Sequence, residues 1–220
     1  MHYRVQLFRG ILQPSICSYQ LSKAEHITSM IKKMILIFIT SILIFSISAY
    51  LGIGNESISR NIHSWSPSEF EAHKAWFALG QVGWGVIWTA FVIFFPALLF
   101  WILTDLAYKK LVILQLFVTV ILLVEKAILI PFQLKLGLDD QSSPFSLGVL
   151  AQYITNNDFM IGFFGAITLF KIGTILLQYN YLKALSDKTN KQLILIILAI
   201  NLIFWIFSAM LSTINFDNLI

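Results

Sequence analysis

Long uninterrupted apolar runs are the feature that most restricts what this chain can fold into. A helix that crosses a lipid bilayer needs about 20 mostly apolar residues. Five stretches meet this requirement, each bounded by charged or turn-forming residues: 34–52, 82–103, 111–130, 159–178 and 193–214. None of them has the polar–apolar alternation over about 10 residues that is typical of a membrane β-barrel strand. The sequence therefore predicts an all-α polytopic bundle of about five transmembrane helices.

The charge content supports lipid rather than water as the surrounding solvent. Charged residues make up only 12% of the chain, and hydrophobic residues make up 58%. A soluble globular domain has roughly 25% charged residues. With half that fraction, too few polar groups remain to cover a surface that faces water.

Basic residues predict the orientation, because cytoplasmic segments of membrane proteins carry an excess of lysine and arginine. Ten of the 15 lie in three segments on one side of the predicted spans, 1–33, 104–110 and 179–192, and three lie on the other side. We therefore expect residues 1–33 to be a cytoplasmic tail and residues 34–214 to be the transmembrane domain. Residues 215–220 would then be an external tail.

The N-terminal tail predicts contact with the membrane surface. Leu7, Ile11 and Leu12 could face lipid from an amphipathic helix, which Gly10 and Pro14 would interrupt. Five basic residues in this tail would be attracted to anionic lipid headgroups. The tail is too short and too sparsely basic to indicate a nucleic-acid partner.

The single cysteine, Cys17, excludes an intramolecular disulfide and a cysteine-based metal site. Its most economical interpretation is a small apolar residue. Lipidation and redox sensing are the functional alternatives.

The outer loops contain two further helix signals. Ser66, Pro67 and Glu69 are typical of a helix start with a capping box, and the mixed segment up to Leu79 suits a helix at the water–lipid boundary. Glycines at 80, 83 and 85 would then mark a bend or a close helix contact. The second half of the loop 131–158 is expected to form a short interfacial helix.

Glu125 and Lys171 are the candidate functional charges, because ionisable residues inside a membrane are costly and are often functional. They lie on predicted antiparallel spans and could meet in an aqueous pocket or as an ion pair. One interpretation is a proton or ion relay, or a docking charge for a partner helix. The other is that Lys171 snorkels along its own helix while Glu125 and Lys126 lie at the interface. The second is favoured, because relays usually contain several carboxylates or histidines.

Evidence for an enzyme is weak. Glu69 and His73 are four residues apart, so they share a helix face, and with His63 they could bind a metal. Exposed loop histidines are common, and Asp139 and Asp140 more simply solvate a loop. No nucleophile–base motif is present, and the glycines at 83 and 85 lack the lysine of a phosphate-binding loop. We expect no catalytic residues, no metal and no cofactor.

Several short motifs resemble the YIP family (the Ypt/Rab-interacting-protein domain), in particular its bacterial branch. They are residues 143–148 (SPFSLG), residues 170–172 (FKI) and residues 182–184 (LKA), in a layout of five spans with a cytoplasmic N-terminus. Two departures from the family are Lys171 and Gly173, where it often has a small polar residue and a tryptophan. The family's longer glycine–tyrosine signature is also missing.

The resemblance implies a non-enzymatic membrane protein that is an accessory for membrane transport or envelope homeostasis. Its partners would be the lipid bilayer and other membrane proteins, such as a transporter of the ATP-binding-cassette type. A composition rich in lysine, asparagine and isoleucine suits the cytoplasmic membrane of a low-GC bacterium. The alternative function is a small transporter or channel component that uses Glu125 and Lys171.

Overall fold

A computed structural model describes residues 2–54, 66–138 and 142–213. Four helices in this part of the chain are long and apolar enough to cross a membrane: α3 (Met30–Tyr50), α5 (Pro67–Thr104), α6 (Tyr108–Leu136) and α10 (Asn190–Ser212). The remaining elements are β1 (His2–Arg4), α1 (Leu7–Leu12), α2 (Pro14–Ser22), β2 (His26–Thr28), α7 (Gly148–Ile154), α8 (Asp158–Gly165) and α9 (Leu169–Leu185). The chain is thus an all-α membrane protein apart from two three-residue strands.

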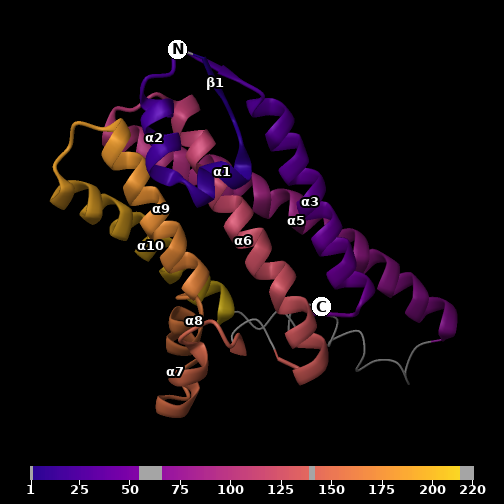
Figure 1. The fold of residues 1–220 in the computed structure, drawn as a ribbon. Coiled ribbons are helices and arrows are strands. Elements are labelled where there is room, and N and C mark those ends of the chain that lie inside the picture. Colours follow the sequence, from indigo (N-terminus) through magenta and orange to yellow (C-terminus); the bar gives the residue numbers. More distant parts are fainter. Residues whose placement is uncertain (1, 55–65, 139–141, 214–220) are drawn as a thin grey trace.

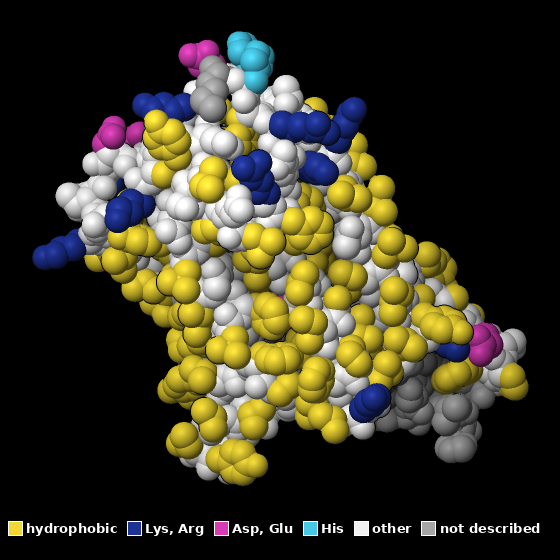
Figure 2. Space-filling view, in the orientation of Figure 1, with side chains coloured by type: hydrophobic (Ala, Val, Ile, Leu, Met, Phe, Trp, Pro, Cys, Tyr) yellow, Lys and Arg dark blue, Asp and Glu magenta, His cyan; other side chains and the backbone are white. Residues whose placement is uncertain are grey.

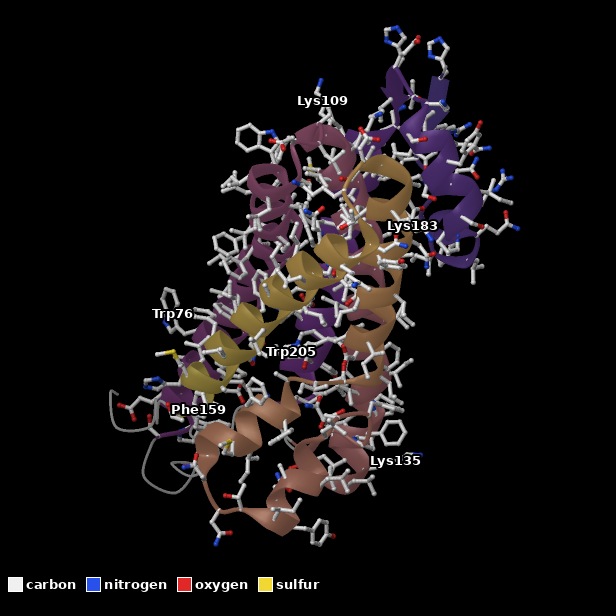
Figure 3. The ribbon with its side chains drawn as sticks, turned by 90° about the vertical axis from the view of Figure 1, so that its left-hand side faces the viewer. Trp76, Lys109, Lys135, Phe159, Lys183 and Trp205 are labelled. Carbon is white, nitrogen blue, oxygen red and sulfur yellow. The ribbon has the colours of Figure 1, made fainter. Side chains whose placement is uncertain are left out.

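Successive long helices run in opposite directions through the bundle (Figure 1). Helix α3 runs away from the end where the N-terminus lies, α5 returns to it, and α6, α9 and α10 alternate in the same way. Lysine and arginine side chains gather at this N-terminal end, and hydrophobic side chains cover much of the face below it (Figure 2). In Figure 3, Lys109 and Lys183 lie near this end and Lys135 lies near the opposite one.

Helix α6 fills the centre of the bundle. It packs against α1, α3, α5 and α9. Every residue from Leu111 to Thr119 is buried, so this part of the helix is covered on all sides. The helix continues through Pro131, which we had expected to begin the loop, and Gly137 ends it in the left-handed backbone region with a φ of 62°.

Helix α5 begins as expected but is longer than predicted. The Ser66 side chain accepts a hydrogen bond from the Glu69 backbone, and the Glu69 side chain accepts one from the Ser66 backbone, which confirms the capping box. The 38 residues that follow form one helix, about 57 Å long at 1.5 Å per residue. The prediction of a separate boundary helix ending near Leu79 is therefore wrong, and the helix has no break at Gly80, Gly83 or Gly85.

The predicted span 159–178 is not a continuous helix. Helix α8 ends at Gly165 and α9 starts at Leu169, so Ala166, Ile167 and Thr168 interrupt it. Neither piece reaches the length of a spanning helix, which is why four helices qualify among the described residues and not five. The short helix expected in the second half of the preceding loop is present as α7.

Residues 2–28 form a folded cap rather than a loose tail. β1 pairs with β2 in parallel, and α1 and α2 lie between them in the sequence and pack against α6 and α9. Tyr3, Val5 and Leu21 are buried in the same core cluster as α6. Leu7 also faces this core, which contradicts the prediction that it faces lipid, whereas Leu12 is exposed.

The other boundaries differ from the predicted ones by a few residues. Helix α3 starts at Met30 and ends at Tyr50, and α10 starts at Asn190. Pro14 is the first residue of α2, so the expected interruption there is confirmed. The predicted external tail, residues 215–220, lies outside the described residues.

Candidate functional site in the membrane domain

The break between α8 and α9 is closed by the loop that precedes α7. The Leu147 backbone N–H donates to the Ile167 carbonyl at 3.1 Å, and the Leu169 N–H donates to the Phe145 carbonyl at 3.0 Å. The Thr168 side chain caps α9 by accepting from the Lys171 backbone N–H at 3.2 Å. Non-helical backbone inside a membrane needs such partners, because lipid offers none.

The serines of this loop are buried although their side chains are polar. Ser143 and Ser146 are 2% and 8% exposed. The Ser146 hydroxyl donates to the Ser143 carbonyl at 2.9 Å, and the Phe145 N–H donates to the Ser143 hydroxyl at 3.3 Å. These local bonds satisfy the loop internally. Residues 143–148 therefore form a folded loop that packs against the start of α9. We call this loop the plug.

Glu125 lies on the side of α6 that faces this plug. It precedes Phe132 by seven residues, which is two helical turns and hence the same face. The ring of Phe132 packs edge-on against Phe145 at a centroid distance of 5.6 Å, and Phe145 packs against Phe170 at 5.6 Å. Glu125 is 6% exposed. Its face is thus directed toward the start of α9.

Lys171 lies at a comparable depth on the neighbouring antiparallel helix. Helix α6 places Glu125 about 26 Å from Tyr108, and α9 places Lys171 about 21 Å from Leu185. Helix α6 begins and α9 ends at the N-terminal end of the bundle (Figure 1). Neither charge is without an interaction in the chain. The structure therefore brings together the regions of the two candidate charges.

Lys126 points to a different side of α6 from its neighbour Glu125. Its ammonium lies over the rings of Phe45 in α3 and Trp88 in α5, at 5.1 Å and 5.7 Å from the centroids. The electron-rich faces of aromatic rings attract cations. Adjacent residues on a helix are about 100° apart, so Glu125 and Lys126 face two different parts of the bundle.

A buried polar contact between α3 and α5 was not predicted. The Ser41 hydroxyl donates to the Gly85 carbonyl at 3.1 Å, and the Thr89 hydroxyl donates to the Ser41 oxygen at 2.7 Å. A Cβ atom on Gly85 would lie 2.8 Å from Phe45, so this glycine permits close approach and confirms the expected helix contact. The spacing of Gly85 and Thr89 is the small-xxx-small signal of membrane helix pairs and was available in the sequence.

The structure does not bring the candidate metal ligands Glu69, His73 and His63 together among its described residues. The carboxylate of Glu69 accepts hydrogen bonds from the Ser66 backbone and hydroxyl, at 2.9 Å and 2.8 Å. His63, Asp139 and Asp140 fall in the segments that are not described. Within the described residues, no three His, Cys, Asp or Glu side chains form a cluster that could hold a metal.

Cys17 is 2% exposed in the N-terminal cap. Burial raises the pKa of its thiol above the ordinary value, against a smaller opposing effect of Arg9. Burial and the nearby Cys17 also raise the pKa of the Tyr3 hydroxyl. A buried thiol with a raised pKa is a poor nucleophile, which favours the packing interpretation of Cys17.

No family model, curated protein or solved structure matches the chain. The fold and composition define its class: an all-α membrane protein with four apolar helices of spanning length in its described part. The finer assignments rest on the site itself.

Proposed function

We propose that this chain is a non-enzymatic, multi-pass accessory protein of the cytoplasmic membrane. It would act through contacts with other membrane proteins, in transport or envelope homeostasis, as the YIP-like motifs imply. The observation that carries this proposal is the position of α6. Because Leu111–Thr119 are buried on all sides, protein occupies the centre of the bundle where a pore would run.

The orientation in this proposal follows from the basic end of the bundle. Lys109 and Lys183 lie at the end that carries the N-terminal cap (Figure 3), and the Lys110 ammonium donates to the Ser22 carbonyl of the cap. Cytoplasmic positive charge would place this end inside the cell. A reporter that is active only in the cytoplasm should work after Asp187 and fail at Asp140 or Ile220. Reporter activity at Ile220 would place both termini in the cytoplasm and would contradict an odd number of membrane crossings.

An assay in proteoliposomes tests the accessory role. Purified protein reconstituted alone should give no flux of protons, sodium or potassium above that of empty vesicles. In parallel, crosslinking in native membranes should join the tagged protein to one integral membrane protein in constant proportion. Ion flux by the protein alone, or the absence of any crosslinked membrane partner, would contradict the proposal.

The second candidate function is a small transporter component, and the interrupted fourth crossing favours it. Transporters often bind substrates where a helix is broken near the middle of the membrane. Here the break at Thr168 lies beside Lys171, and the Glu125 face of α6 is directed toward it. Flux that disappears in Glu125→Gln and in Lys171→Met, with folding intact, would establish this function.

A further inference from the structure

A second polar site lies on a different side of α6 from the plug. A cavity of about 240 Å³ lies between α3, α5 and α6, and its lining includes Gly54 and Leu138, which follow the C-terminal ends of α3 and α6. Its polar lining includes Lys126, Gln81, Gln133 and Ser48. Its apolar wall includes Phe45 and Trp84. Four polar side chains therefore line one cavity in a membrane helix bundle.

The charge in this cavity is positive. Lys126 is the one ionisable residue among the described residues that line it, and no carboxylate is among them. The rings of Phe45 and Trp88 stabilise the ammonium from one side. Such contacts are weaker than a charge-assisted hydrogen bond to an anion. An anionic group bound beside the amides of Gln81 and Gln133 would therefore stabilise the Lys126 ammonium more than the two rings do.

The size and position of the cavity indicate what carries that anion. Pockets for whole drug-sized ligands occupy about 300–1,000 Å³, and this one is smaller. Tryptophan and lysine are typical of the membrane boundary, where lipid headgroups lie. Ile47 in α3 and Ile87 in α5 are close in sequence to the lining residues Ser48 and Trp84. Both are exposed and could lie along an acyl chain.

We infer that this cavity binds the phosphodiester headgroup of an anionic membrane lipid, with Lys126 as its charge partner. The acyl chains remain outside, along the apolar faces of α3 and α5. The inference does not depend on the proposed accessory role, because lipid binding is measured on the protein alone.

Photocrosslinking tests the inference with the full-length protein in vesicles. Three photoactivatable probes are compared at equal mole fraction: phosphatidylglycerol, phosphatidylcholine and a fatty acid. Labelled peptides are mapped by mass spectrometry. Phosphatidylglycerol should label the segments around Phe45 and Trp84 about tenfold more than phosphatidylcholine, the ratio expected for one charge-assisted hydrogen bond. Preferential labelling by the fatty acid would overturn the phosphodiester assignment.

Variants at one position separate charge from packing. Lys126→Met should reduce the preference for phosphatidylglycerol to about one, and Lys126→Arg should keep it. Lys135→Met is the matched control, since Lys135 is an exposed lysine of the same helix outside the cavity, and it should leave the preference unchanged. If the Lys126→Met protein fails to fold, Lys126→Gln is the neutral variant to measure instead. Equal labelling by both phospholipids in the wild type, or an unchanged preference in the neutral variants, would overturn the inference.

Discussion

Gly10 holds the N-terminal cap against the membrane bundle, and its replacement should release the cap. Its Cα approaches α6 so closely that a Cβ atom would lie 2.5 Å from the ring of Phe117. Its carbonyl accepts a hydrogen bond from the buried hydroxyl of Tyr181 in α9 at 2.9 Å. Phe117 and Tyr181 are both fully buried and their rings pack together at 5.4 Å. Neither ring can move without opening a void.

The expected magnitude follows from this overlap. Inserting a methyl group into a tightly packed core costs about 1–3 kcal/mol. Helix propensity opposes this cost, because alanine is better than glycine in a helix by about 1 kcal/mol. A Cβ atom 2.5 Å from a buried ring corresponds to the upper part of the packing cost, about 2–3 kcal/mol. The net cost of about 1–2 kcal/mol should raise the population of the undocked cap about 5- to 30-fold, at about 1.4 kcal/mol for each factor of ten.

Cys17 is a built-in reporter for this opening. It is the only cysteine of the chain and is 2% exposed in the docked cap. Its alkylation rate in purified protein, when opening is fast and reversible, is proportional to the population of the open state. We expect Gly10→Ala to accelerate labelling within the stated range, while the unfolded protein labels equally fast in both forms.

Gly173→Ala is the matched control. Gly173 is also a helical glycine, in α9, but a Cβ atom there would have no neighbour within 4 Å. It should leave the labelling rate of Cys17 unchanged. Equal labelling rates in Gly10→Ala and the wild type would refute the proposed close contact, as would equal acceleration by the control.

Three further predictions concern other parts of the molecule. Thr89→Val should destabilise the α3–α5 contact by about 0.6 to 1.7 kcal/mol in a detergent unfolding titration; the control is Thr40→Val, whose hydroxyl bonds only within α3. Burial raises the pKa of the Cys17 thiol, so the docked cap favours the neutral thiol. The cap should be fully docked below the ordinary thiol pKa, and its docking should weaken as pH rises through the raised pKa of the docked state. Amide exchange in α2 should then become faster at alkaline pH, and exchange that slows with pH after correction for intrinsic rates would contradict this. For a lysine that snorkels, Lys171→Met should leave the melting temperature unchanged or slightly raised. A lower melting temperature that Glu125→Gln restores would instead show an ion pair between Lys171 and the buried Glu125, because removing one partner strands a buried charge.

The length of the apolar runs was sufficient to find the long helices, because length and hydropathy are properties of each segment alone. It was not sufficient for the fourth run. Ala166 and Ile167 are apolar like the runs on either side, and no proline or glycine stands among residues 166–168. What breaks the helix there is pairing with the loop that contains Leu147, a contact between segments about 20 residues apart. The local signal was Thr168, which has the side chain of an N-cap residue three positions before Lys171.

The N-terminal cap was missed for a related reason. Its two strands have three residues each, too short for an alternating pattern, and they pair across more than twenty residues. Its buried face is completed by α6 and α9, so residues such as Leu7 looked like the apolar side of a surface helix. The charge pattern of the same segment remained informative, because basic residues stay at the end of the bundle whether the tail is loose or folded.

Helix α9 connects the cap with the plug, and its position depends on both. Tyr181 near its last turn donates to Gly10 of the cap, and Thr168 at its first turn is bridged to Ser146 of the plug. The helix has 17 residues, so these contacts lie about 20 Å apart along one rigid element. Undocking the cap with Gly10→Ala should therefore also speed amide exchange at Leu169, whose N–H bonds to the plug. Exchange that rises in α1 and α2 but stays unchanged at Leu169 would mean that the plug alone holds α9.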